Sequence, residues 1–212
     1  MSVVDPNLDV AISTILDRRA KSDAGRSILV GVSGIDASGK GFIANRIVQR
    51  LLKHHIRAVV VAGDGWLNLP SERFDIRTPG LHFYENALRM DEMFEQLVLP
   101  LKNKRSHGGV MDFAEETATT YRRQWYTFEN MDVVVLECIF LFKRHYRHYF
   151  DVAIWIDCSF ETALERAIQR AQEGLSEAET VRAYQTIYFP AQRIHFDQDL
   201  PREGADVIID NG

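Results

Sequence analysis

The segment from residue 28 to residue 48 constrains the fold of this chain more than any other. A short apolar run, Ile28 to Val32, leads into a glycine-rich loop, and a helix-like run follows at once. The loop matches the pattern G-x-x-x-x-G-K from Gly34 to Lys40. A strand, such a loop and a helix in this order are typical of a phosphate-binding loop. A glycine-rich turn that only packs a helix against a sheet is the alternative.

The residue types of this phosphate loop, Gly34 to Lys40, suit the binding of phosphate. Gly34 and Gly39 can adopt backbone angles that a Cβ forbids, so successive N–H groups can turn toward phosphate oxygens. Lys40 adds a mobile positive charge, and the following helix adds the positive end of its dipole. The predicted nucleotide-binding residues are Gly34, Ile35, Asp36, Ala37, Ser38, Gly39, Lys40, Gly41 and Phe42.

One position departs from the motif. The pattern continues with Ser or Thr after the lysine, because that hydroxyl binds Mg²⁺, and this chain has Gly41 instead. The sequence therefore predicts phosphate binding, and it leaves metal-dependent transfer of a phosphoryl group open.

Length and composition fit one domain over residues 1–212, large enough for a buried sheet with helices on both faces. No apolar run approaches the roughly 20 residues that span a bilayer, and the N-terminus does not resemble a signal peptide. The net charge of −5 argues against a nucleic-acid partner. Cys138 and Cys158 are expected to be free thiols. We predict a cytoplasmic protein with no membrane partner.

Strand-like and helix-like segments alternate along the chain, which favours an α/β fold with a mostly parallel, buried sheet and helices on both faces. Residues 67–81 are expected to be irregular because of two prolines, and residues 102–109 to be a loop or hairpin tip. The expected strands are 28–32, 59–62, 133–136, 152–156 and 207–209; the expected helices are 8–26, 42–53, 86–97 and 160–172.

Charged residues follow three of the expected strands. Lys40 follows the first, Asp64 the second, between two glycines, and Glu137 the third. Ligands of open α/β sheets bind at the carboxyl ends of the strands. Phosphoryl transfer needs a cation, a carboxylate for Mg²⁺ and often a carboxylate that orients the attacking hydroxyl. The alternatives are a turn-capping role for Asp64 and a structural ion pair for Glu137.

Arginines near the C-terminal third suggest a lid. Arg166 and Arg170 lie four residues apart on one helix face, before a polar segment, so their guanidinium groups could close over the transferred phosphoryl group. A solvated helix face is an equally open interpretation. Arg182 and Arg193 are further candidates, and Asp157 is expected to cap the helix that begins near residue 160.

Taken in order, these motifs resemble the uridine kinase-like branch of P-loop kinases, related to pantothenate kinase and phosphoribulokinase. The resemblance is carried by residues 34–40, 64–67, 135–141 and 150–157, by Arg166 with Arg170, and by residues 202–211. It implies the three-layer sandwich of P-loop NTPases and ATP-dependent phosphorylation of a hydroxyl on a small molecule.

The same resemblance implies roles for single residues. Asp64 would orient or deprotonate the acceptor, Glu137 would hold Mg²⁺ or its water, and Lys40, Arg166 and Arg170 would act on the phosphates, with a lid near residues 166–190. Uridine kinases hold the nucleobase with a Tyr-Asp-Phe stretch and a downstream histidine. The matching segment here, residues 111–116, keeps Phe113 for stacking but places Glu116 at the histidine position.

The acceptor is expected to be nucleoside-like, with Tyr84 and Glu85 binding sugar hydroxyls and Phe83 in the pocket or in the core. The leading hypothesis is thus a small-molecule kinase that uses ATP and Mg²⁺. The alternative is a nucleotide-binding protein of the same fold with weak or no kinase activity, because Gly41 replaces a metal ligand. An ATPase switch is a third, weaker hypothesis. The sequence predicts neither the acceptor's identity nor the oligomeric state.

Overall fold

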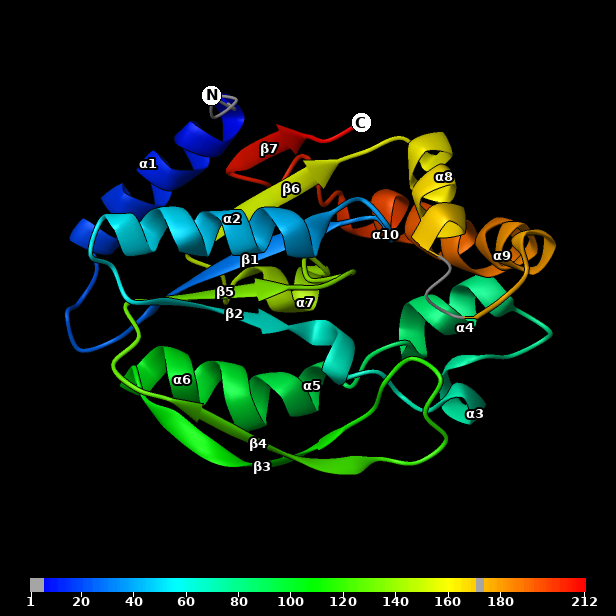
Figure 1. Ribbon diagram of the computed structural model, residues 1–212, viewed down its shortest axis with the longest axis horizontal. Helices are drawn as coiled ribbons and strands as arrows, with labels where there is room; N and C mark the ends of the chain where they lie inside the picture. The colour runs from blue at the N-terminus through cyan, green and yellow to red at the C-terminus, as the bar shows by residue number, and fades with distance from the viewer. Residues whose placement is uncertain (1–5, 171–173) are drawn as a thin grey trace.

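A five-stranded, all-parallel sheet forms the centre of this computed structural model, which describes residues 6–170 and 174–212. The strand order is β2-β5-β1-β6-β7, so the strand that carries the phosphate loop lies in the middle (Figure 1). The strands are β1 Ile28–Gly34, β2 Ala58–Ala62, β5 Val133–Glu137, β6 Val152–Asp157 and β7 Val207–Asp210. The predicted parallel sheet is confirmed.

Helices cover both faces of the sheet, which completes the predicted three layers. Successive side chains of a strand point to opposite faces. Ile28 and Val30 therefore pack under α1 (Pro6–Ala20) and α2 (Lys40–Lys53), whereas Leu29 belongs to the core on the other face. That second core is covered by the helical segments around α5 (Met90–Met93), α6 (Leu99–Lys104), α8 (Phe160–Arg170) and α10 (Phe189–Asp199).

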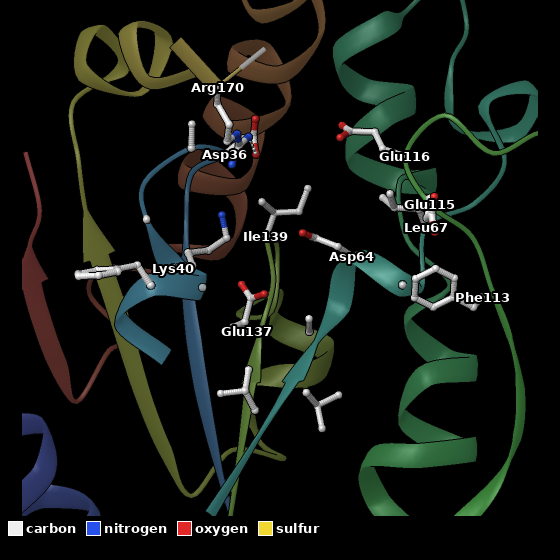
Figure 2. A pocket seen from close by; sticks show the side chains of 18 of the residues that line it. Asp36, Lys40, Asp64, Leu67, Phe113, Glu115, Glu116, Glu137, Ile139 and Arg170 are labelled. Atoms are coloured by element: carbon white, nitrogen blue, oxygen red, sulfur yellow. Dashed lines mark ion pairs between the residues drawn. The ribbon is translucent and has the colours of Figure 1, made fainter. Parts of the chain in front are cut away.

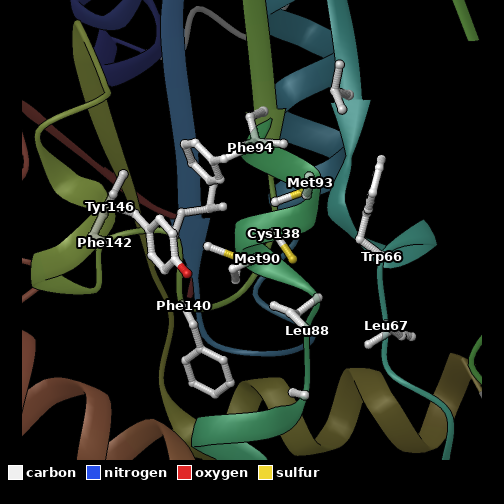
Figure 3. Close-up of a cluster of buried hydrophobic side chains, with 14 of the residues drawn as sticks. Trp66, Leu67, Leu88, Met90, Met93, Phe94, Cys138, Phe140, Phe142 and Tyr146 are labelled. Atoms are coloured by element: carbon white, nitrogen blue, oxygen red, sulfur yellow. The ribbon is translucent and has the colours of Figure 1, made fainter. Parts of the chain in front are cut away.

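The second core fixes the segment that follows β5. Phe94 stacks on Tyr146 of the short helix α7 (Arg144–Arg147) with ring centres 5.1 Å apart, and it meets Phe150 edge to face. Figure 3 shows Phe94 and Tyr146 near Cys138, which is fully buried and a free thiol. Because Cys138 directly follows Glu137, this packing holds the end of β5 in place.

The predicted irregular segment 67–81 is partly helical. Its two prolines begin helices α3 (Pro70–Arg73) and α4 (Pro79–Asn86) rather than prevent them. Proline suits the first turn of a helix, because its missing N–H would have no partner there and its fixed φ is already helical.

The predicted helix 86–97 begins later and ends later. It runs from α5 through a π-helical turn, Phe94–Val98, into α6, and so passes Pro100. Pro100 cannot donate to the carbonyl of Gln96, and the ring Nε2 of His107 donates to that oxygen instead, over 2.8 Å. The replacement donor comes from a distant part of the chain, and sequence periodicity does not reveal it.

The expected loop or hairpin tip at residues 102–109 is wrong: residues 102–104 end α6, and His107 begins a strand. The sequence analysis missed the two-stranded antiparallel hairpin, β3 (His107–Phe113) and β4 (Arg122–Phe128), which residues 114–121 connect. It lies beyond the β2 edge of the sheet, next to α5 and α6 (Figure 1). The remaining helix, α9 (Glu177–Ala183), leads through a second π-helical turn, Tyr184–Tyr188, into α10.

Two boundary predictions need correction. Helix α1 ends at Ala20 rather than near residue 26. Asp157 does not cap α8: the hydroxyl of Ser159 accepts from the backbone N–H of Thr162 over 3.0 Å, while Asp157 accepts from Arg202. Across the described ranges, no helix combines the length and apolar character that a membrane crossing requires.

Candidate active site

A pocket of about 920 Å³ opens at the carboxyl ends of β1, β2 and β5, where ligands of open α/β sheets bind. Figure 2 shows Lys40 and Glu137 on one side, Asp64 in the middle and Phe113 on the other side. The lining residues include Asp36, Lys40, Gly41, Phe42, Asp64, Phe83, Phe113, Glu115, Glu116, Arg122, Tyr126, Glu137, Ile139, Arg170, Tyr188 and Gln192.

The phosphate loop depends on its glycines for close contacts. Gly39 has a φ of +88°, and a Cβ there would lie 2.5 Å from the side-chain nitrogen of Asn211. That nitrogen donates to the carbonyl of Ser38 over 2.7 Å. A Cβ on Gly34 would lie 2.7 Å from the carbonyl oxygen of Ile156. The loop is therefore shaped by direct backbone contact with its neighbours in the fold.

Polar groups inside the loop fit an anionic ligand. Lys40 is buried, and its ammonium donates to the carbonyl of Ile35 over 2.9 Å. The hydroxyl of Ser38 is buried without a hydrogen-bond partner. An unpaired buried donor is costly, and a phosphate oxygen would satisfy it.

A carboxylate within the loop is held by the C-terminal helices. Tyr184 donates to Asp36 through its hydroxyl, and the guanidinium of Arg170 lies 4.0 Å from the same carboxylate. Arg170 thus reaches the loop from the end of α8.

Asp64 lies in the tight turn Gly63–Gly65 that ends β2. A Cβ on Gly63 would lie 2.4 Å from the sulfur of Cys138, and one on Gly65 would lie 2.5 Å from the ring of Phe113. The two glycines therefore allow the turn to pack tightly on both sides, which aims Asp64 into the pocket. Burial among protein atoms raises the pKa of Asp64, while Lys40 opposes the shift.

Glu137 ends β5 beside the phosphate loop and is buried. Burial raises the pKa of Glu137 to about 7; the positive charge of Lys40 lowers it and the neighbouring Asp64 raises it. Two carboxylates next to one lysine make a site that a cation would stabilise.

Gly41 leaves room beside this carboxylate. A Cβ there would lie 3.6 Å from Oε1 of Glu137, an ordinary contact. Within residues 6–170 and 174–212, no cluster of three or more His, Cys, Asp or Glu side chains forms a complete metal cage. Mg²⁺ in kinases is usually held by one or two carboxylates, waters and substrate phosphates, so this donor set fits it.

The hairpin forms the far wall of the pocket. The guanidinium carbon of Arg122 lies 4.4 Å from the ring centre of Phe113, and Arg122 also pairs with Glu115 over 3.1 Å. Tyr126 and Glu116 line the same side. Phe113 itself lines the pocket, and its stacking on a nucleobase stays a prediction.

Two predicted substrate residues lie elsewhere. The hydroxyl of Tyr84 donates to Asp199 over 2.6 Å, and Lys143 covers its ring at 4.1 Å. Glu85 is exposed to solvent. Phe83, from the same helix α4, does line the pocket. Successive helical residues point about 100° apart, so only one of these neighbours faces inward.

Of the two predicted lid arginines, only one lies at the pocket. Arg170 lines the pocket, but Arg166 donates to the carbonyl of Asn211 over 2.7 Å, away from the lining. The predicted lid near 166–190 includes residues 171–173, which lie outside the described residues. Sequence reasoning missed Asn211, although it follows the last strand and the strand-end rule points to it.

Comparisons with known proteins agree with this geometry. A family model described as Phosphoribulokinase / Uridine kinase family matches residues 29–185. Uridine kinase-like protein 3 of Arabidopsis thaliana is 28% identical over 199 residues, covering 91% of this chain and 41% of that protein. Uridine-cytidine kinase 2-B of Danio rerio is 26% identical over 210 residues, covering 92% of this chain and 78% of that protein.

A solved structure of a possible uridine kinase from Bacillus stearothermophilus shares the fold, with a TM-score of 0.74 and 23% identity over 97% of this chain and 98% of that one. The family match extends from β1 to the turn before α10 and includes the phosphate loop, Asp64 and Glu137. The chain therefore belongs to the phosphoribulokinase / uridine kinase family of P-loop small-molecule kinases.

Proposed function

We propose that this protein transfers the γ-phosphoryl group of ATP to a hydroxyl of a nucleoside-like small molecule. The observation that carries the proposal is one continuous pocket, in which the phosphate loop and Glu137 lie on one side, Asp64 in the middle and an aromatic hairpin on the other. A phosphate donor, a cation and an acceptor can therefore meet at Asp64.

On the donor side, the loop backbone, Lys40 and Ser38 bind the phosphates of ATP. Glu137 would hold Mg²⁺, and the ion would neutralise the charge of the phosphates when it is bound. Arg170 is placed to stabilise the charge that develops on the transferred group. Arg166 donates a hydrogen bond to the carbonyl of Asn211 and supports the phosphate loop from outside the pocket.

At the centre, Asp64 accepts the proton of the acceptor hydroxyl. The hydroxyl oxygen forms a bond to the γ-phosphorus, and the bond from that phosphorus to the bridging oxygen of ADP breaks. A carboxylate whose pKa is raised toward neutrality is a better proton acceptor than one with an ordinary pKa.

A nucleoside-like acceptor is supported by the aromatic walls of the pocket. Phe113 offers a ring face, and Phe83 and Tyr188 meet edge to face 5.0 Å apart in the lining. Flat heterocycles stack on such rings, typically for about 1–3 kcal/mol per base. The similarity to a uridine kinase-like protein and to a uridine-cytidine kinase supports the same class of acceptor.

The test is ATP consumption with a panel of nucleosides, sugars and vitamins, comparing wild type with Asp64→Asn. We expect a nucleoside to be phosphorylated and kcat to fall about 10²- to 10⁴-fold in the variant. Asp17→Asn, on the exposed side of α1, is the matched control. Equal ATP consumption by wild type and Asp64→Asn across the panel would refute transfer through Asp64.

A second function, nucleotide binding with weak or no transfer, is favoured by Gly41. Gly41→Ser and Gly41→Thr restore a hydroxyl beside Glu137, and Gly41→Ala adds a Cβ alone. If turnover rises in Gly41→Ser and Gly41→Thr but not in Gly41→Ala, the metal site of the wild type is impaired. Absence of transfer in all four proteins, with ATP binding retained, would establish the binding function instead.

A further inference from the structure

Helix α10 carries a buried glutamine that the roles above leave unused. Gln192 lines the pocket, yet its residue is only 1% exposed. Neither its side-chain nitrogen nor its side-chain oxygen has a hydrogen-bond partner. Among the residues that the structure describes, it is the buried side-chain amide whose nitrogen and oxygen both lack a partner.

This arrangement is unfavourable without a ligand. A buried amide without hydrogen bonds lowers the folding equilibrium constant by roughly 5- to 150-fold, a cost that leucine or methionine in the same space would not carry. Buried polar side chains are paired in the large majority of cases. A carboxamide kept unpaired at the wall of a pocket is therefore placed to meet a polar group that enters the pocket.

The neighbours of Gln192 limit what that group can be. Tyr188 lies one turn earlier on the same helix face, and Phe83 packs edge to face against it. One turn later, His195 is fully buried, and its Nδ1 lies 2.7 Å from the carboxylate of Asp199. Burial lowers the pKa of His195, which favours the neutral ring, and in a neutral ring whose Nδ1 donates to Asp199 the unpartnered Nε2 is an acceptor.

In the pocket lining, α10 and the turn before it thus contribute an aromatic ring and an uncharged amide, and the imidazole of His195 lies outside the lining. A carboxamide presents a donor and an acceptor side by side, and its complement is a group with the same pair reversed. Glutamine recognises the edges of bases in this bidentate way. A carboxylate or phosphate would satisfy only the amide nitrogen and leave the oxygen unpaired.

We propose that Gln192 is a specificity-determining residue, which hydrogen-bonds an uncharged lactam-type edge of the acceptor, an N–H next to a C=O. The proposal rests on the proposed function and adds the group by which the acceptor is selected. The competing explanation is a buried water that satisfies the amide permanently.

The experiment pairs an acceptor that has the edge with one that lacks its donor. Uridine and N3-methyluridine are compared in wild type, in Gln192→Met and in Gln198→Met, an exposed glutamine on the same helix. We expect wild type and Gln198→Met to prefer uridine by about 10- to 100-fold in kcat/KM. In Gln192→Met this preference should fall close to 1, with the KM for ATP unchanged.

The outcomes separate the two proposals. Phosphorylation of uridine with the same preference in wild type and Gln192→Met overturns the role of Gln192 and leaves the proposed function intact. Phosphorylation of amide-free sugars alone overturns both the nucleoside-like acceptor and the lactam edge. If no acceptor is phosphorylated, the transfer function is overturned, and uridine binding then tests the role of Gln192. A larger rise in Tm on addition of uridine for wild type than for Gln192→Met supports that role, and equal rises overturn it.

Discussion

The donor side and the acceptor side of the pocket are built in different ways. The donor side consists of the phosphate loop, one contiguous segment between β1 and α2, with Glu137 from the adjacent strand β5. The acceptor side is assembled from the hairpin, α4 and α10, which are far apart along the chain. The donor side is encoded by a short sequence motif, whereas the acceptor side depends on tertiary packing.

The difference also extends to charge. Lys40 and Glu137 lie on the donor side with Asp64 next to them, and burial and like charge raise the pKa of both carboxylates. The acceptor side relies on rings, on the exposed pair of Arg122 with Glu115 and on the uncharged Gln192. The donor side should therefore be sensitive to pH and to metal ions, whereas the acceptor side should be sensitive to substitutions that change the shape of the pocket wall.

The largest expected effect concerns the stability of the ligand-free protein against pH. Folding raises the pKa of Glu137 from 4.5 to about 7, so the folded state holds this proton more tightly than the unfolded state. Stability from this group is present below pH 4.5 and is lost as pH rises to about 7. The loss should be about 3 kcal/mol in the free energy of unfolding, measured by urea denaturation between pH 4.5 and 8.

Glu137→Gln is the control, because glutamine keeps the shape and cannot ionise. The difference in unfolding free energy between wild type and Glu137→Gln should change with pH over this window and level off above it. A difference that stays constant with pH would show that ionisation of the buried Glu137 does not destabilise the folded state. Mg²⁺ with a nucleotide should reduce the dependence in wild type, because a bound cation stabilises the ionised form.

This contrast explains what the sequence predicts and what it does not. The loop, the parallel sheet and the acids at strand ends follow from local motifs and from one rule about strand ends. The hairpin was missed, because the strands from His107 and from Arg122 are half-exposed and pair mainly with each other. Tyr84 was preferred over Phe83 because sequence alone does not fix which face of α4 meets the pocket.

The second prediction acts on the acceptor side. Gly65→Ala places a Cβ 2.5 Å from the ring of Phe113, so the ring or the Asp64 turn must move. We expect a loss of about 1–3 kcal/mol in the free energy of unfolding and a higher KM for the acceptor. The KM for ATP should stay unchanged, because the contact lies away from the phosphate loop.

Gly109→Ala is the matched control within the hairpin, since a Cβ there meets only the terminal carbon of Met111 at 3.6 Å. It should change stability by less than about 0.5 kcal/mol. If both variants behave alike, the close packing of Gly65 on Phe113 does not position the acceptor wall.

The smallest expected effect returns to the donor side and to a residue at the far end of the chain. Asn211→Ala removes the hydrogen bond to the carbonyl of Ser38, worth about 1 kcal/mol, so the KM for ATP should rise about fivefold. Asn211→Asp keeps the shape, loses the donor and adds a negative charge near Gly39, so its KM for ATP should rise further. Neither variant should change the KM for the acceptor. If the acceptor KM rises as much as the ATP KM, the two sides of the pocket are mechanically coupled, and the division between a local donor side and an assembled acceptor side does not hold.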